Sequence, residues 1–313
     1  MKANYFCSQK GKEYIYMMEI NNMSIAIVIL HYNDYELTRQ YIRNLEKQCW
    51  DNISYKYIVV DNASPDGSGK KLFEYYKDNE KVDVIILNEN VGFSKGNNIG
   101  IKRAVDIYNP ALIIVSNNDI EIPDFTFMQK LTCLYKEINF DVMGPDIYST
   151  RREFHQSPIR EQHLSIDELE KLMKKNKRLL YILKVIDKIK VYNLISHIKR
   201  KIKGEFQNCK GYDKRQEGVV LQGAFFVLSR GYLEAYPDGL YPETFLYLEE
   251  DILDFRVKKK HLKSVYIPDL SVLHFEGVSS IKKHKNNRCK KYIYELEQTN
   301  LSCKVMIQYL KET

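Results

Sequence analysis

Polar side chains follow an apolar run at one point of the chain, in the stretch VSNNDIE of residues 115–121. Two amides and two carboxylates stand there directly after the run ALIIV. Carboxylate and amide oxygens are the ligands that hard divalent cations prefer. The stretch is therefore either a loop that turns back into solvent or part of a site for a charged ligand.

Four apolar runs separated by helical patterns are predicted to position this stretch. They cover residues 24–31, 55–61, 82–88 and 111–116. Near-continuous apolar runs are typical of parallel strands that are buried on both faces. Helical patterns fill residues 35–47, residues 71–78 and the segment that follows NVGFSKGNN and ends near Tyr108. Strands and helices that alternate at this spacing indicate an open α/β sheet with right-handed crossovers.

Each predicted strand ends in polar residues. The ends read HYND, DNASPDGS, NENVGFSKGNN and SNNDIE. Ligands of open α/β sheets bind beyond the carboxyl ends of the strands. One polar end is a turn, whereas four at the same edge indicate a binding site.

A dinucleotide-dependent oxidoreductase is excluded, because the segment HYNDYE after the first run contains no glycine.

Composition indicates an ordinary globular chain with one unusual segment. The length of 313 residues is enough for one large domain or two small ones. Hydrophobic residues make up 44% and charged residues 28%, which is ordinary for a globular protein. The six cysteines are far apart, the first twenty residues lack a signal-peptide core, and no apolar run reaches about 18 residues. We therefore expect a cytoplasmic protein without a transmembrane helix. Residues 150–215 carry a local charge of +10, against +7 for the whole chain.

The basic segment is predicted to be helical. Ser165 and Glu168 form a capping box, and the helical pattern runs from there to Lys203, with Gly204 as a stop signal. Two interpretations of residues 160–204 stay open. The basic face is either simply solvated, or it docks on an anionic membrane surface at the inner face of the plasma membrane. Nucleic acid is not expected as a partner, because no nucleic-acid-binding module is recognisable.

Six segments, taken in order, resemble family 2 glycosyltransferases of the GT-A fold. VILHYNDYELT, VDNASPDGSG, NENVGFSKGNNIGI and SNNDIEI resemble the nucleotide-sugar half, while GAFFVLSR and FLYLEEDILDFR resemble the acceptor half of the rhamnosyltransferase-like branch. The resemblance implies an open mixed sheet flanked by helices, with a basic helical insertion and a helical C-terminal tail. The implied divisions are an extension (1–23), a nucleotide-sugar half (24–150), the insertion (151–216), an acceptor half (217–280) and the tail (281–313).

The resemblance also implies a donor site and a metal site. Asp61 would accept the N3–H of a pyrimidine base, and Lys95 would meet a phosphate. The other implied donor-binding residues are His31, Tyr32, Asn33, Asn62, Asn88, Gly92, Phe93, Asn98, Asn117 and Asn118. Asn117-Asn118-Asp119 stands where the family has D-x-D or a variant, so Asp119, Asn117 and His274 would bind Mn²⁺ or Mg²⁺. Because the first carboxylate is missing, we expect a weakened metal affinity.

The acidic run Glu249-Glu250-Asp251 would supply the catalytic base. Register from Arg256 favours Glu250, and its two neighbours stay alternatives. Acidic residues also stabilise helix starts, so the run allows a purely structural interpretation. The implied activity is inverting transfer from dTDP-rhamnose or a UDP-hexose to a hydroxyl of a growing, lipid-linked cell-surface polysaccharide. The alternative is a non-catalytic nucleotide-sugar-binding subunit of a polysaccharide assembly complex.

Overall fold

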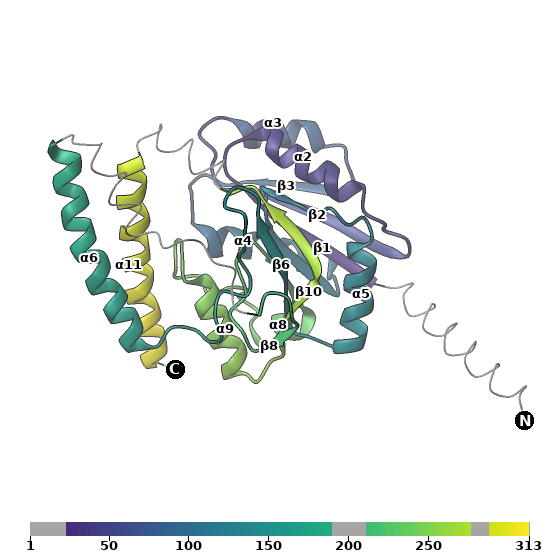
Figure 1. Cartoon of the computed structure of the whole chain (residues 1–313). Coiled ribbons are helices and arrows are strands. Elements are labelled where there is room, and N and C mark those ends of the chain that lie inside the picture. The colour runs from purple at the N-terminus through teal and green to yellow at the C-terminus, as the bar shows by residue number, and fades with distance from the viewer. Residues whose placement is uncertain (1–22, 190–210, 277–287, 313) are drawn as a thin grey trace, which may run out of the picture.

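A computed structural model describes residues 23–189, 211–276 and 288–312 (Figure 1). The expected N-terminal extension lies outside the described residues except for Met23. The same holds for the predicted continuation of the insertion helix from residue 190 to Lys203, for Gly204, and for residues 281–287 of the expected tail.

The described residues form one mixed sheet of ten strands. Its order is β3-β2-β1-β4-β9-β6-β10-β5, with β7 paired to β6 and β8 to β10. The first four strands are parallel, whereas β9 is antiparallel to both β4 and β6. The strands are β1 (Met23–His31), β2 (Ile53–Asp61), β3 (Val82–Ile86), β4 (Leu112–Asn117), β5 (Ile120–Glu121), β6 (Val142–Ser149), β7 (Phe154–His155), β8 (Gln216–Glu217), β9 (Phe225–Ser229) and β10 (Ser264–His274).

Helices cover both faces of this sheet, which is why its central strands are apolar without alternation. Along β1, Ile25, Ile27 and Ile29 face one hydrophobic core, while Ala26 and Val28 face the other. The first core is covered by α2 (Tyr35–Glu46), α3 (Ser68–Tyr76) and α5 (Phe127–Ile138). The second is covered by α4 (Phe93–Tyr108), α8 (Arg230–Ala235) and α9 (Glu249–Lys259).

The four predicted strands are present, and two helices begin earlier than their apolar patterns suggested. Helix α3 starts at Ser68, and α4 starts at Phe93, inside the NVGFSKGNN segment. Gly92 makes the second start possible, because its φ of 87° turns the backbone so that the Phe93 amide donates to the Phe245 carbonyl at 2.8 Å. The polar strand end thus passes directly into a helix.

Two long helices stand side by side away from the sheet (Figure 1). They are α6 (Ile166–Ile189) and α11 (Arg288–Glu312). The capping box is present: the Glu168 amide donates to Ser165 Oγ at 3.3 Å, and the Ser165 amide donates to Glu168 Oε2 at 2.8 Å. Among the described residues, no helix combines the length and the apolar character that crossing a membrane requires.

Candidate active site

The ends of β1 and β2 lie side by side, with His31 in register with Asp61. The His31 ring is fully buried, and its Nδ1 and Nε2 lie 2.7 Å from the hydroxyls of Thr38 and Ser68. Burial lowers the pKa of His31 to about 4, so the ring is neutral at neutral pH. Its side chain therefore joins α2 to α3 beneath the strand ends, and only its backbone is left to border a ligand.

Asp61 is held in place by a serine and a glycine. The Ser64 amide donates to Asp61 Oδ1 at 3.1 Å, and the Ser64 hydroxyl donates to the same oxygen. A β-carbon at Gly69 would lie 1.8 Å from Asp61 Oδ2, so the carboxylate depends on this glycine for space. Burial raises the pKa of Asp61, and the Ser64 bonds partly counteract that rise.

Ser64 also connects Asp61 to the end of β1. The Asn33 amide donates to Ser64 Oγ at 2.8 Å, which brings the segments after β1 and β2 together. Asn33 has a φ of 62°, and its buried Oδ1 has no hydrogen-bond partner among the described residues. A buried acceptor without a partner is costly unless a ligand satisfies it. Tyr32, beside it, is half-buried.

The loop after β3 is shaped by side-chain amides. Asn62 Nδ2 donates to the Gly92 carbonyl at 3.0 Å, and the Val91 amide donates to Asn62 Oδ1 at 2.9 Å. Asn98 bonds the backbone of Leu240 with both of its amide atoms, each at 2.7 Å. The amide groups of both residues are thus used within the protein: Asn62 fixes the loop, and Asn98 fixes α4 to the backbone at Leu240.

The remaining expected residues of this loop differ in exposure. Asn88 is exposed and Phe93 is buried, while Lys95 is exposed with its Nζ 4.0 Å from Glu243 Oε1. An ion pair this long and this exposed is weak. Lys95 is therefore free to turn towards an anionic ligand.

The three residues of the N-x-D tip lie at the end of β4 and in the turn that follows it. The Asn117 amide donates to the Ala224 carbonyl at 2.9 Å, and the Asn117 side chain is half-buried. Asn118 Nδ2 donates to Thr38 Oγ1 at 2.9 Å, so this side chain joins the hydrogen-bond network around His31. Asp119 follows and is 8% exposed.

Asp119 and His274 face each other across neighbouring strands. His274 ends β10, which pairs antiparallel with β5, and the Phe275 amide donates to the Asp119 carbonyl at 3.0 Å. His274 Nε2 lies 3.3 Å from Asp119 Oδ1. Adjacent ligands of an octahedral Mg²⁺ lie about 3 Å apart, given metal–oxygen distances of about 2.1 Å.

The contact of Gln156 with His274 determines that the ring nitrogen facing Asp119 carries a lone pair. Gln156 Nε2 donates to the Glu276 carboxylate, so its Oε1 is the atom that lies 2.8 Å from His274 Nδ1. That contact makes Nδ1 the donor, and Nε2 and the Asp119 oxygen are then two acceptors 3.3 Å apart. Such a pair needs a proton or a metal ion between its members. The donor set fits a divalent cation, although no third His, Cys, Asp or Glu joins it among the described residues.

The acidic run opens α9, as its position in the sequence suggested. The two residues before it, Tyr247 and Leu248, have φ values of 71° and 64°, which non-glycine residues rarely adopt. Glu250 Oε1 accepts from the Gly223 amide at 3.2 Å, whereas Glu249 Oε2 is buried without a partner among the described residues. Burial raises the pKa of both glutamates, and the charge of Glu250 raises that of Glu249 further.

Asp251 is used differently from its two neighbours. It is 1% exposed, its Oδ2 accepts from Arg160 Nη2 at 3.1 Å, and its Oδ1 accepts from the Leu164 amide at 2.9 Å. Asp254, one turn later, accepts from the His163 amide at 3.0 Å. These two carboxylates fasten the segment before α6 to α9, so Glu249 and Glu250 remain the candidates for proton transfer.

The sequence profile of glycosyl transferase family 2 matches residues 26–199. The chain belongs to this family. It is 27% identical over 125 residues to the low-salt glycan biosynthesis hexosyltransferase Agl10 of Haloferax volcanii, a match to 39% of this chain and 36% of that one. It is 31% identical over 140 residues to the dTDP-rhamnosyl transferase RfbF of Shigella flexneri, covering 44% and 43%. The matches thus span less than half the length of these curated relatives.

Solved structures show the same fold as this member of family 2. GalNAc-T7 with UDP, GalNAc and Mn²⁺ superposes with a TM-score of 0.56 at 12% identity, covering 82% of this chain and 44% of that one. TarS 1–349 of S. aureus in complex with UDP-GlcNAc gives 0.51 at 14% identity, covering 82% and 59%. The fold is GT-A, as the sequence resemblance implied.

Several residues that hold the candidate site in place have no signal of their own in the sequence. Gln156 lies in an irregular segment, and its contact with His274 joins residues 118 positions apart. Thr38 looks like any polar residue on α2. Only Ser64 follows a recognisable pattern, because an aspartate in a turn commonly accepts from backbone and hydroxyl groups two or three residues later.

Proposed function

We propose that this protein is an inverting glycosyltransferase that moves a sugar from a nucleoside-diphosphate donor to a hydroxyl group. One observation carries the proposal: the Asp119 carboxylate and the His274 imidazole meet at 3.3 Å, at the carboxyl edge of a sheet that also presents Asp61. A base-recognising carboxylate and a cation-binding pair at one edge suit the two ends of a nucleoside diphosphate.

A divalent cation is the metal that this pair would hold. When bound, Mg²⁺ or Mn²⁺ neutralises the charge that grows on a leaving diphosphate. Asp119 would contribute an oxygen ligand and His274 would contribute Nε2, while Gln156 keeps the ring oriented through Nδ1. Asn117, on the same strand end, supplies an amide that can border the ribose or the metal.

Proton transfer falls to Glu250 in this proposal. An acceptor hydroxyl must lose its proton as it attacks the anomeric carbon, and a carboxylate within hydrogen-bond reach can accept it. The Gly223 amide fixes Glu250 Oε1 at 3.2 Å, and a β-carbon at residue 223 would come within 2.8 Å of that oxygen. Burial raises the pKa of Glu250 towards the range in which a general base works at neutral pH.

The donor that we propose is dTDP-rhamnose or a UDP-hexose. The name of RfbF supports the first, and the UDP-GlcNAc complex of TarS supports the second. Asp61 accepts from the N3–H that uracil and thymine share, so it does not distinguish the two bases. The acceptor that we propose is a hydroxyl of a lipid-linked cell-surface glycan.

A non-catalytic sugar-nucleotide-binding subunit is the second candidate. Asn117 favours it, because an amide stands where a second carboxylate would strengthen the metal site. Turnover separates the two candidates. A binding subunit gains stability from the donor but releases no nucleoside diphosphate. An enzyme gains stability from the donor and also releases nucleoside diphosphate.

Thermal stability with a panel of nucleoside diphosphates tests the donor site. A ligand at a hundred times its Kd stabilises the folded state by about 2.7 kcal/mol, which raises Tm by several degrees. We expect UDP or dTDP with Mn²⁺ to produce this rise, and GDP, which carries a purine, to produce little. The proposal fails if none of these nucleotides changes Tm in the presence or absence of Mn²⁺.

Substitution of Gly69 tests the role of Asp61 in base recognition. The added β-carbon of Gly69→Ala would meet Asp61 Oδ2 at 1.8 Å, so the carboxylate must move although alanine itself favours the helix. We expect the Kd of UDP or dTDP, measured by calorimetry, to rise about tenfold, the loss of one charged hydrogen bond. Gly67→Asn is the control, because nothing lies within 4 Å and asparagine tolerates its φ of 73°. Equal affinities in both variants would remove Asp61 from the donor site.

A further inference from the structure

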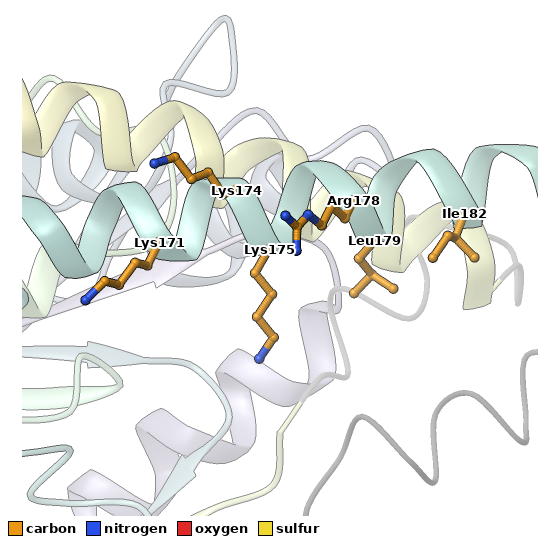
Figure 2. A pocket seen from close by; sticks show the side chains of 6 residues that line it. All are labelled: Lys171, Lys174, Lys175, Arg178, Leu179 and Ile182. Atoms are coloured by element: carbon orange, nitrogen blue, oxygen red, sulfur yellow. The ribbon is translucent and has the colours of Figure 1, made fainter.

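One face of α6 carries four cationic side chains followed by three exposed apolar ones. Successive residues of the set are one or three positions apart, so at 3.6 residues per turn all seven fall on one stripe of the helix. Figure 2 shows Lys174 at one edge of the stripe and Lys171 and Lys175 at the other. The docking stripe consists of Lys171, Lys174, Lys175, Arg178, Tyr181, Ile182 and Val185.

The opposite face of α6 already has its packing partners. Near the start of the helix, Leu169 packs with Met306 of α11 and Ile252 of α9. Further along, Leu183 and Ile186 pack with Leu296 of α11. The inner apolar face is therefore satisfied within the protein. The stripe is a second and separate face that contributes nothing to the described core.

The apolar half of the stripe is unusually exposed. Tyr181 is 74% exposed, Ile182 46% and Val185 43%. Single exposed apolar residues are normal on protein surfaces, whereas three on adjacent turns of one face form a patch. This patch continues the cationic half without interruption.

The cationic half of the stripe has no ion pair among the described residues. Lys184, by contrast, lies off the stripe and pairs with Glu297 of α11 at 2.6 Å. The charge of Lys171 does lower the pKa of Glu168, one turn earlier on the helix. Lys174, Lys175 and Arg178 are thus available to an external anion.

We propose that the docking stripe binds the surface of a membrane that contains anionic lipids. Helices that lie in a membrane interface combine Lys or Arg, which reach the headgroups, with aromatic and aliphatic side chains, which enter the acyl boundary. Lysines and an arginine in the first half and Tyr181, Ile182 and Val185 in the second supply both components. A nucleic acid would use only the cations and would leave the apolar half in water.

The helix that carries the docking stripe packs beside the candidate base. Helices α6 and α11 pack on Leu248 and Ile252, which flank the acidic run of α9. Ser302 Oγ of α11 also donates to the Leu246 carbonyl at 2.6 Å. A lipid surface bound to the stripe would therefore lie at a fixed distance and orientation from Glu250, where we expect the acceptor hydroxyl. This consequence rests on the proposed function, whereas lipid binding itself does not.

Sedimentation of the full chain with vesicles tests the charged half. We expect binding to vesicles of phosphatidylcholine with phosphatidylglycerol, and little binding to phosphatidylcholine alone. Each cation near an anionic surface contributes about a fivefold gain, so Lys174→Gln with Lys175→Gln should weaken binding about 25-fold. Lys70→Gln with Lys71→Gln is the control, because these neighbours are also exposed lysines on a helix, away from the stripe. Equal losses in both double variants would overturn the proposal.

Salt separates the apolar half from the charged half. At about 1 M salt the screening length is about 3 Å, so the binding that remains there is mainly apolar. Ile182→Ser with Val185→Ser should remove most of this remainder, because only Tyr181 of the apolar half is left. Val105→Ser with Ile107→Ser, on α4, removes side chains of the same types at 38% and 37% exposure and should leave it unchanged. Wild-type binding in the α6 variant at this salt concentration would contradict the apolar contact.

Two further results distinguish this proposal from its alternatives. Asp119→Ala should bind vesicles as the wild type does, so docking can fail or succeed independently of catalysis. A dimer that is lost in the Lys174/Lys175 variant, together with an absence of vesicle binding, would assign the stripe to a second copy of the chain. Binding to RNA but not to vesicles would assign it to nucleic acid. Either result would overturn the lipid proposal.

Discussion

Glu250→Gln is expected to lower turnover by about a hundredfold or more, the usual size of a general-base contribution. Glutamine keeps the shape of the side chain and can still accept from the Gly223 amide, which lies 3.2 Å from Glu250 Oε1. It cannot take a proton from an attacking hydroxyl. Donor binding should stay almost unchanged, because Glu250 stands on α9, whereas the expected donor residues lie at the ends of β1, β2 and β4, in the loop after β3 and on α4.

Steady-state turnover and calorimetric donor affinity, measured on the same variants, check this result. Asp251→Asn is the matched control for the loss of a charge in the run. Asp251 is bonded to Arg160 and Leu164, so we expect lower stability from this variant with its turnover largely kept. A loss of turnover in Glu249→Gln that exceeds the loss in Glu250→Gln would move the base to Glu249. A loss of donor affinity in Glu250→Gln would make Glu250 a metal or structural residue.

The pH dependence of turnover follows from the same carboxylates. Burial raises the pKa of Glu250, and a base works only when it is ionised, so turnover should fall with falling pH at a higher value than an ordinary glutamate would give. Among the neighbouring charges, Asp251 is the one that raises the pKa of Glu250. Asp251→Asn should therefore move this acidic limb of the profile to lower pH. A limb that stays in place would mean that burial alone sets the pKa of Glu250.

Sequence patterns predicted four of the ten strands. Of these, β1, β2 and β4 gave the clearest patterns because they are largely buried on both faces. Val28 and Ile29 of β1 point to opposite cores, so no polar residue interrupts the run and its length marks the strand. Helix starts were less predictable. The start of α4 at Phe93 depends on the Phe245 carbonyl, which lies more than 150 residues later in the chain.

Sequence patterns predicted which residues lie near the candidate site. They did not predict which of those side chains are already hydrogen-bonded within the protein. Asn62, Asn98 and Asn118 belong to the polar strand ends, yet each is bonded to other parts of the protein. A sequence motif identifies a side chain without showing which of its atoms are still available. The contact of Gln156 with His274 could not be predicted, because it depends on how an irregular segment returns to β10.

The insertion shows the same limit on a larger scale. Its amphipathic pattern predicted a helix after Ser165, and α6 confirms it up to Ile189. The pattern did not predict that the inner face packs on α9 beside the acidic run, because Leu169 meets Leu248 and Ile252 only in the folded chain. Asp251 and Asp254 strengthen this attachment and give the acidic helix start a structural role beside the catalytic role that we propose.

Asp119→Ala is expected to remove most metal-dependent activity. A cation that stabilises a leaving diphosphate supplies several kcal/mol to the transition state, so its loss should lower turnover by about a hundredfold or more. Binding of Mn²⁺, followed by electron paramagnetic resonance, should weaken in parallel. Asp124→Ala is the control, because this carboxylate lies five residues later and bonds Thr126 and Lys130 at the surface.

Gln156→Leu is expected to give an intermediate effect on the same metal site. Leucine keeps approximate size but cannot accept from His274 Nδ1, which lies 2.8 Å from Gln156 Oε1 in the wild type. Loss of such an orienting hydrogen bond typically weakens metal affinity by about tenfold to a hundredfold. We therefore expect Mn²⁺ affinity to fall in the order wild type, Gln156→Leu, Asp119→Ala. Unchanged Mn²⁺ binding and turnover in Asp119→Ala would mean that the 3.3 Å pair shares a proton instead of a metal ion, and transfer would then have to proceed without this site.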